Sequence, residues 1–220
     1  LDGITSDMML MYEAYLKTRE VRMNTISFYM RNLRAVYNRA VEKGLTTQQY
    51  PFRHVYTGVD KTVKRAIPIK AIKALKDLDL ATNLTLDFAR DMFMFSFYTR
   101  GMSFVDMAYL KKTDLQNGML TYRRRKTGQE LSIKWEKCMA EIIAKYPENK
   151  TGFLLPIIKE QGDERRQYDN ALHLVNYRLK ELSTMLKLQR PLTMYVARHS
   201  WASAAKAKNV PLSVISEGMG

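Results

Sequence analysis

Apolar residues recur at helical spacing in two segments near the start of the chain. The first segment is SDMMLMYEAYLKT, residues 6–18, and the second, ISFYMRNLRAVYNRAVEKG, ends at Gly44. An apolar position every three to four residues predicts amphipathic helices, and glycine often lies just past a helix end. We expect short polar residues to cap these helices: Ser6 or Asp7 for the first, Asn24 or Thr25 for the second.

The helical period is lost over residues 45–66, which include Pro51 and Gly58. Both residue types interrupt regular structure, so this segment is the best candidate for a domain boundary. It ends in the basic run DKTVKR. We therefore expect a helical domain over residues 1–56, a linker over 57–66 and a second domain over 67–220.

The second domain shows the helical period except at residues 119–134, MLTYRRRKTGQELSIK. Two short runs flank KTGQ there, which predicts a hairpin with Gly128 in the turn. Because side chains alternate along a strand, we expect Arg124 and Lys126 to share a face. Helices are expected near residues 68–77, 82–99, 136–146, 168–187, 194–208 and 211–218. The predicted fold class is mainly α with a small antiparallel β-sheet.

Charge narrows the choice of partner. The 220 residues include 36 lysines and arginines against 22 acidic residues, which gives a net charge of +14. Such a surplus favours a polyanion, because basic side chains that neutralise phosphates release counterions. Nucleic acid is the leading interpretation, an anionic membrane surface is the second, and a basic protein without either partner is the third.

Cysteine usage excludes some classes of site. Cys138 is the only cysteine, so no disulfide forms within the chain, and we expect a reducing compartment, the cytoplasm. No Cys/His cluster suggests zinc, and no carboxylate cluster suggests a two-metal nuclease. The sequence contains no run of about 18 apolar residues, so no membrane-spanning helix is predicted.

Three segments carry the candidate chemistry. They read FYTRGMSFVDMAYL (97–110), TYRRRKTGQELSI (121–133) and LTMYVARHSWASAAKAKNVPLSVISEGMG (192–220). In this order and at these separations they resemble the catalytic domain of tyrosine recombinases, the phage integrase family. The earlier TISFYMRNLRAVYNRAVEKG resembles the family's helical, SAM-like core-binding domain. The amino-acid sequence of these four segments is most similar to that of the branch carried on conjugative and other mobile elements.

The resemblance implies site-specific DNA recombination or integration without a metal or nucleotide cofactor. A tyrosine attacks a backbone phosphate, forms a 3′-phosphotyrosine and releases a 5′-hydroxyl. The implied partners are double-stranded DNA and other copies of the protein in a tetrameric synapse, with no membrane. The implied fold is a DNA breaking-rejoining catalytic domain joined to the core-binding domain.

The resemblance also assigns candidate residues. Arg198 matches the second catalytic arginine, whose planar fork suits phosphate oxygens, and the alternative is a buried structural arginine. Lys126 matches the hairpin lysine that protonates the leaving 5′-oxygen, and the alternative is a solvated turn residue. Arg124 is a candidate phosphate contact, and Arg31, Arg34 and Lys43 are candidate DNA contacts of the core-binding domain.

Two positions depart from the family pattern. Ser103 occupies the place of the first catalytic arginine, three residues before the acidic Asp106. We expect Arg100 or Arg124 to replace it, and capping of the preceding helix is the equal alternative for Arg100. Tyr195 stands where the family has histidine.

Two ring side chains flank Arg198. Tyr195 shares a helix face with it and is a candidate donor to a phosphate oxygen rather than the nucleophile. His199 is expected to be structural and to bond a carbonyl or carboxylate.

The family's nucleophilic tyrosine follows a segment like SEGMG by about ten residues, beyond Gly220. We therefore expect these 220 residues to bind DNA without cleaving it covalently, while the full-length protein is the enzyme. The rivals are a recombinase relative that binds DNA without chemistry, a type IB topoisomerase, and a basic helical scaffold.

Overall fold

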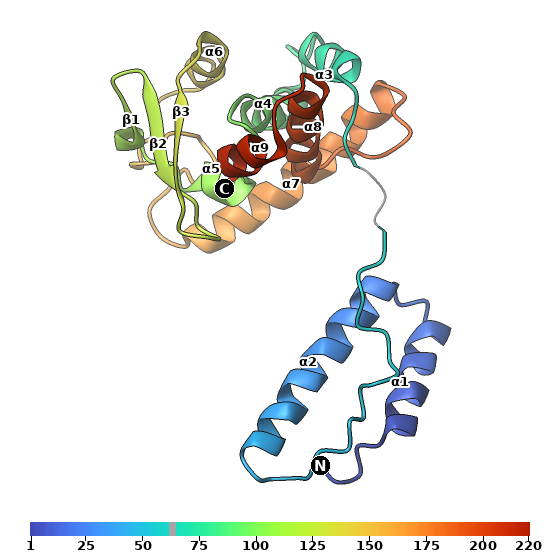
Figure 1. The fold of residues 1–220 in the computed structure, drawn as a ribbon. Helices are drawn as coiled ribbons and strands as arrows, with labels where there is room; N and C mark the ends of the chain where they lie inside the picture. The colour runs from blue at the N-terminus through green and yellow to red at the C-terminus, as the bar shows by residue number, and fades with distance from the viewer. Residues whose placement is uncertain (62–64) are drawn as a thin grey trace. The chain divides into compact units, whose positions relative to one another are not determined.

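The computed structural model describes residues 1–61 and 65–220, so part of the predicted linker, residues 62–64, lies outside the described residues. The chain divides into two compact units, Leu1–Val63 and Lys64–Gly220, which Figure 1 shows. Each unit is described by itself. No helix in the described part of the chain has the length and apolar character needed to cross a membrane.

The first unit contains two helices, α1 (Ser6–Thr18) and α2 (Met23–Glu42), followed by an extended segment. Both helices match their predicted positions, and Gly44 follows α2 with a positive φ of 68°. The buried apolar side chains come from all three parts: Met9, Leu16, Ile26, Met30, Tyr37, Phe52 and Val55. The extended segment therefore completes the core of a unit that has only two helices.

The predicted caps of these helices are wrong. Thr5 caps α1 by accepting a hydrogen bond from the Met8 amide, 3.2 Å away. Asn24 lies inside α2 and bonds the backbone of Asp60 instead, through its amide nitrogen (3.1 Å) and its amide oxygen (2.7 Å). A long-range partner therefore competes successfully with the local capping role of asparagine.

The second unit is mostly helical. Its helices are α3 (Ile69–Lys76), α4 (Leu84–Tyr98), α5 (Phe104–Ala108), α6 (Lys137–Ala144), α7 (Glu164–Met185), α8 (Met194–Ala207) and α9 (Leu212–Met219). All but α5 were predicted, although α7 begins four residues before its expected start at residue 168. Helix α5 has only five residues, too few for a recognisable period.

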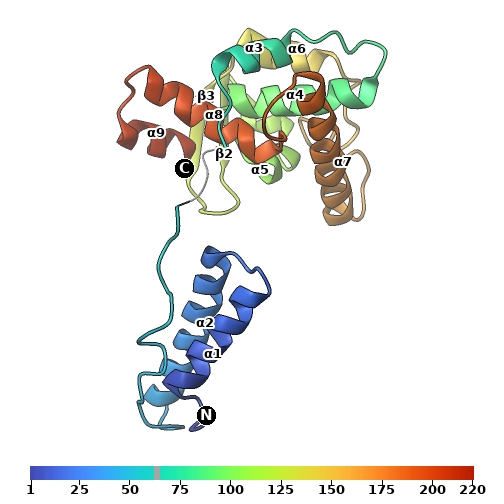
Figure 2. The same cartoon turned by 90° about the vertical axis from the view of Figure 1, so that its right-hand side faces the viewer.

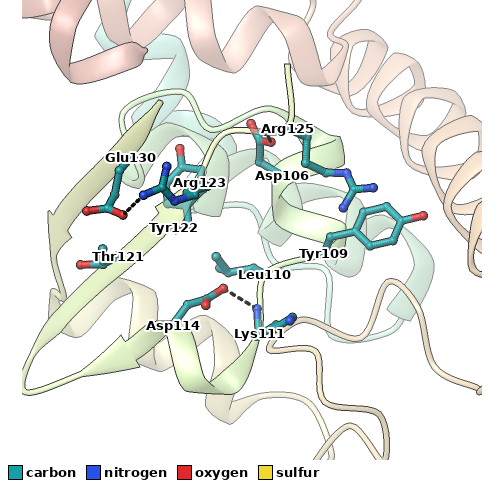
Figure 3. A pocket seen from close by; sticks show the side chains of 10 residues that line it. All are labelled: Asp106, Tyr109, Leu110, Lys111, Asp114, Thr121, Tyr122, Arg123, Arg125 and Glu130. Carbon is teal, nitrogen blue, oxygen red and sulfur yellow. Dashed lines mark hydrogen bonds and ion pairs between the residues drawn. The ribbon is translucent and has the colours of Figure 1, made fainter. Parts of the chain in front are cut away.

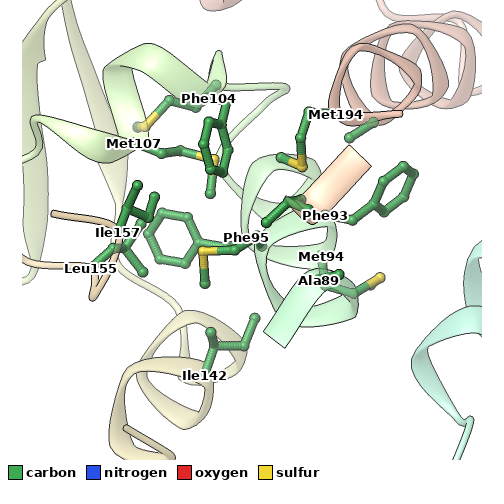
Figure 4. Close-up of a cluster of buried hydrophobic side chains, with 14 of the residues drawn as sticks. Ala89, Phe93, Met94, Phe95, Phe104, Met107, Ile142, Leu155, Ile157 and Met194 are labelled. Carbon is green, nitrogen blue, oxygen red and sulfur yellow. The ribbon is translucent and has the colours of Figure 1, made fainter. Parts of the chain in front are cut away.

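Helix α4 forms the centre of this unit and packs against α6, α7 and α8 (Figure 2). Its sequence is apolar on most sides, and Met92, Phe93 and Phe95 are fully enclosed, as predicted. Figure 4 shows Phe95 among side chains from α5, α6 and the segment before α7, and Phe93 toward Met194 of α8. Burial of this helix fixes the position of Arg100, which follows its end, and of helix α8.

The sheet has three antiparallel strands in the order β1 (Leu115–Gln116), β2 (Met119–Arg123) and β3 (Glu130–Lys134). A short 3₁₀ helix, η1 (Lys112–Asp114), precedes it. The predicted hairpin joins β2 to β3, and Gly128 in its turn has a φ of +72°. The side chains that point into the core alternate along both strands: Leu120, Tyr122, Leu131 and Ile133. Strand β1, with two residues, was not predicted.

Candidate active site

Arg198 lies on α8 and is partly buried. Met194 and Ala197 of the same helix are buried. The Nη1 atom of Arg198 donates to the carbonyl oxygen of Gly101 at 2.9 Å, and Nη2 donates to that of Met219 at 2.9 Å. Burial lowers the pKa of this guanidinium from its ordinary value, and the charge of Arg124 lowers it further. An arginine remains charged in a protein, so the site keeps a fixed, oriented cation.

Gly101 makes the position of Arg198 possible. Its φ is +76°, and a Cβ atom placed there would lie 2.7 Å from the Cα of Arg198. Only glycine avoids both the conformational strain and the backbone collision. The close approach of the two backbones therefore requires the glycine of the TRG sequence.

Arg100 precedes this glycine and also has a positive φ, 59°. The carbonyl end of α4 is bonded by other groups: Thr99 Oγ1 donates to Phe95 O, and the Gly101 amide donates to Ser96 O, both at 2.7 Å. No hydrogen bond from Arg100 to a carbonyl of α4 occurs within the described residues. Its Nη1 atom instead reaches α9, 3.7 Å from where a Cβ on Gly218 would lie.

Asp106 is buried at the centre of a polar cluster. Its Oδ2 accepts a hydrogen bond from Ser103 Oγ at 2.6 Å, and its Oδ1 accepts one from the Arg125 amide at 2.9 Å. Arg124 Nε lies 3.9 Å from Oδ2 and is buried without a hydrogen bond in the part of the chain that the structure describes. Ser103 also caps α5. The carboxylate therefore ties the start of α5 to the base of the hairpin turn.

Sequence reasoning placed Asp106 in an acidic family position but assigned it no role. The spacing Ser-x-x-Asp, a serine three residues before an acid, was the available signal for a helix start. The link to the hairpin had no local signal, because Asp106 and Arg125 are 19 residues apart.

Lys126 lies in the hairpin turn and is exposed. The expectation that it shares a strand face with Arg124 is wrong, because β2 ends at Arg123. The turn is closed by two backbone hydrogen bonds of 2.8 Å, from the Arg124 amide to Gln129 O and from the Gly128 amide to Arg124 O. Side-chain alternation therefore stops before the lysine, and Arg124 turns inward while Lys126 faces solvent.

A hollow of about 370 Å³ lies beside this turn, and Figure 3 shows the side chains that line it. The guanidinium of Arg125 stacks on Tyr109, with its Cζ 3.9 Å from the ring centroid. The Arg125 side chain and its amide thus hold the turn against α5 at two points. The hollow is lined by Asp106, Tyr109, Leu110, Lys111, Asp114, Thr121, Tyr122, Arg123, Arg125 and Glu130, so it touches neither Arg198 nor Lys126.

Tyr195 and His199 share the exposed face of α8, as the helical spacing predicted. Their rings pack at right angles with centroids 4.5 Å apart. The predicted hydrogen bond from His199 to a carbonyl or carboxylate is absent among the described residues. Burial lowers the pKa of His199, as do the nearby charges of Arg65 and Arg198. A cationic surrounding with no acceptor explains why the imidazole packs on a ring instead.

The segment that enters the second unit is fastened to α8. The Ile67 amide donates to the buried Ser200 Oγ at 3.0 Å, and Arg65 Cζ lies 5.6 Å from the Tyr195 ring centroid. Sequence reasoning missed both contacts, since they join residues more than 120 positions apart.

The pKa of the Tyr122 phenol is affected by several charged side chains around it. Tyr122 is buried on β2, and burial followed by the charge of Asp106 raises its phenol pKa far above the ordinary value. The charges of Arg124, Arg198 and Arg100 act on the same phenol in the opposite direction. Distances at the end of α9 place three arginines near one another. Arg100 Nη1 lies 3.7 Å from a Cβ placed on Gly218, Arg198 Nη2 donates to Met219 O at 2.9 Å, and Arg124 Cδ lies 3.0 Å from a Cβ placed on Gly220.

The three candidate DNA contacts of the first unit are exposed on α2 or at its end. Arg31 lies in mid-helix and its Nε donates to Ser27 O at 3.3 Å, Arg34 follows one turn later, and Lys43 is the C-cap residue. Arg31 and Arg34 lie about 60° apart around the helix, whereas Lys43 lies about 180° around it from Arg34, so the three residues do not share one face.

Comparisons with known proteins agree with this architecture. The whole chain superposes on a lambda integrase dimer bound to a COC′ core site, with a TM-score of 0.71 at 14% identity, and covers 77% of that chain. The chain has the fold of the tyrosine recombinases. The Tn1549 transposon integrase in complex with circular intermediate DNA gives a TM-score of 0.68 at 13% identity, with 100% of this chain and 78% of that chain covered.

A third recombinase, XerH bound to difH substrate, gives a TM-score of 0.68 at 14% identity, with 100% of this chain and 65% of that chain covered. Residues 1–55 match the family model of the phage integrase SAM-like domain. No curated protein sequence matches the chain. The recombinase fold is thus retained at very low sequence identity, and the SAM-like domain coincides with the two-helix first unit.

Proposed function

We propose that the chain supplies the DNA-binding and phosphate-activating parts of a site-specific tyrosine recombinase. The observation that carries this proposal is the meeting of Arg100, Arg124 and Arg198 at the end of α9 within a recombinase fold. A pentavalent phosphorane carries negative charge on its equatorial oxygens, and preorganised cations around it lower the barrier to its formation. No cofactor is required.

In this mechanism a tyrosine oxygen attacks the phosphorus and the bond from phosphorus to the 5′-oxygen breaks. Arg198 binds two phosphate oxygens, which its orientation by Gly101 prepares it to do. Arg100 takes the role of the family's first catalytic arginine, whose place Ser103 occupies. Arg124 is an additional phosphate contact. Lys126, on the exposed turn, gives its proton to the departing 5′-oxygen.

Tyr195 donates a hydrogen bond to a phosphate oxygen, and His199 supports its ring. We assign the nucleophile to neither Tyr195 nor Tyr122. Tyr122 is buried and its raised pKa disfavours the phenolate, while Tyr195 stands in the position of a phosphate donor.

The first unit binds duplex DNA through Arg31, Arg34 and Lys43 as a core-binding domain over residues 1–56. Phosphate contacts of this kind set the position of a protein on DNA. Lambda integrase occurs as a dimer on a core site and as a tetramer on a Holliday junction, which supports assembly of several copies on DNA.

Cleavage by the whole protein tests the proposal. Its recognition sequence is obtained by selection from a random duplex pool and is built into a suicide substrate that traps the covalent intermediate. Arg198→Ala should reduce trapping by at least about 100-fold while DNA affinity stays within a few-fold. Arg166→Ala, an exposed arginine on α7, is the matched control and should cleave normally.

A DNA-binding relative without chemistry is the second candidate. It is favoured by Ser103, whose hydroxyl bonds Asp106 where the family has an arginine, and by Tyr195 in place of histidine. A whole wild-type protein that binds the selected site but never forms a covalent complex would support this candidate and refute catalysis.

A further inference from the structure

A second hollow, of about 230 Å³, lies in the first unit between the C-terminal half of α2 and the segment that follows it. Its lining residues are Arg34, Asn38, Gln48, Tyr50, Pro51, Phe52 and Arg53. It is smaller than the cavities that hold drug-sized molecules, so it suits one flat group with an attached anion.

The charge of this hollow is purely positive. Arg34 and Arg53 are exposed, neither forms an ion pair among the described residues, and no acidic residue contributes to the lining. Residues 23–59 include five lysines and arginines but only one acid, Glu42. The hollow therefore favours an anion and offers it two guanidinium groups.

Its polar wall is organised by a chain of amides. Gln48 Oε1 accepts from the Tyr50 amide at 2.9 Å, and Gln48 Nε2 donates to Asn38 Oδ1 at 3.4 Å. This arrangement orients the Asn38 carboxamide and leaves its amide nitrogen without an acceptor in the described part of the chain. A free amide donor of this kind suits an acceptor on the major-groove edge of a base, such as N7 of a purine, O6 of guanine or O4 of thymine.

Tyr50 lies at the edge of the hollow, above core residues that hold its segment in place. Tyr37 is buried, its hydroxyl donates to Thr47 O at 2.9 Å and accepts from the Gln49 amide at 3.2 Å, and its ring packs on Phe52. Tyr50 then adopts a φ of +50° and remains 68% exposed. A non-glycine residue in this strained region, with its ring in solvent, is a feature found at binding sites.

We propose that this hollow is a sequence-reading site for duplex DNA, which takes one nucleotide of one strand. Arg34 and Arg53 bind its flanking phosphates, Asn38 hydrogen-bonds the base edge, and Tyr50 packs against the sugar. The inference rests on the proposed function, because it requires that the first unit binds DNA. It adds Asn38, Tyr50 and Arg53 to the DNA contacts, and it assigns affinity to the arginines and sequence specificity to Asn38.

The test is binding-site selection from a random duplex pool by the full chain, followed by affinity measurements at several salt concentrations. Arg53→Ala should weaken binding to all sequences and lower the salt slope by about 0.9, the effect of one lost phosphate contact. Asn38→Ala should keep the wild-type slope but lose preference at one base pair, by roughly 5- to 140-fold.

Matched controls lie on the same helix. Arg39→Ala removes an equal charge about 140° around α2 from Arg34, and Asn32→Ala removes an equal amide outside the hollow. Circular dichroism spectra identify variants that fail to fold. Asn38→Asp, which replaces the amide donor with an acceptor, then takes the place of Asn38→Ala. It should change the preferred base at the same position.

Two results would overturn the inference. One is an Asn38 variant that selects the wild-type sequence while its affinity is unchanged. The other is adenosine monophosphate binding that depends on Asn38 while DNA selection does not, which would make the hollow a free-nucleotide site. If the wild-type chain binds no DNA, the proposed function itself fails, so the two failures are distinguishable.

Discussion

Asp106 is a single carboxylate on which two elements depend. Replacing it by asparagine keeps one acceptor but removes the charge opposite the buried Arg124 Nε. We expect Asp106→Asn to lower the free energy of unfolding by about 1–3 kcal/mol, the cost of leaving a buried polar group unmatched. Urea unfolding followed by circular dichroism measures this change.

The matched control is Glu130→Gln on the same hairpin. Glu130 pairs with Arg123 at 3.1 Å, but both side chains are mostly exposed, and such pairs contribute about 1 kcal/mol or less. Equal losses in the two variants would contradict the role given to Asp106.

His199 gives the unit a pH dependence whose sign follows from its surroundings. Its pKa lies below the ordinary 6.5 because of burial and the charges of Arg65 and Arg198. Between 6.5 and the lower folded value the unfolded state binds the extra proton, so stability falls as the pH decreases through that window. His199→Gln should flatten the profile there, as measured by unfolding at a series of pH values. A variant profile identical to that of wild type would refute this.

At the scale of elements, Gly101 sets the distance between α8 and the turn after α4. Gly101→Ala adds the strain of a positive φ and a collision 2.7 Å from Arg198 Cα. We expect a loss of at least about 2 kcal/mol in unfolding free energy. Urea unfolding measures the stability, and suicide-substrate trapping by the whole protein measures the accompanying fall in DNA cleavage.

Gly118→Ala isolates the collision from the strain. Gly118 has a similar φ of +73°, but no atom lies within 4 Å of its would-be Cβ. This variant should lose less stability and keep normal cleavage. Similar cleavage defects in both variants would show that the contact with Arg198 is not the cause.

The longer helices and the hairpin could be predicted from the sequence because their hydrophobic patterns extend over many residues. Helix α4 is apolar on most sides and proved central, and the KTGQ hairpin has its glycine in the turn as predicted. Helix α5 and strand β1 were not predicted, because segments of five and two residues are too short to show a hydrophobic period. Asn24 shows a further limit, since its long-range bond to Asp60 displaced the expected cap.

The candidate site was predictable only as far as local motifs reach. Arg198, Lys126 and the acidic position of Asp106 were found through short motifs. The turn that separates Lys126 from the face of Arg124 depends on backbone geometry at Gly128. The contacts of Arg65, Ile67 and Gly101 with α8 join distant parts of the chain, so no local pattern encodes them.

At the scale of the whole molecule, the net charge of +14 predicts a steep salt dependence of DNA binding. The logarithm of the binding constant should fall linearly with the logarithm of salt concentration. Removing Arg31 and Lys43 together should reduce the magnitude of the slope by about 1.8, the sum of two phosphate contacts. Fluorescence anisotropy at several potassium chloride concentrations measures it.

Lys137→Ala combined with Arg166→Ala removes the same charge from exposed positions of the second unit. This double variant should change the slope by less than the first. An equal change would mean that net charge alone, rather than the positions of Arg31 and Lys43, governs affinity.

The hydrogen bond from Ile67 to Ser200 has a mechanical consequence. The covalent connection between the units enters the second one through a segment tied to the middle of α8, two residues from Arg198. Tension along that connection would act on this hydrogen bond, on the contact of Arg65 with Tyr195 and, through both, on α8. The connection is thus anchored to the helix that carries Arg198.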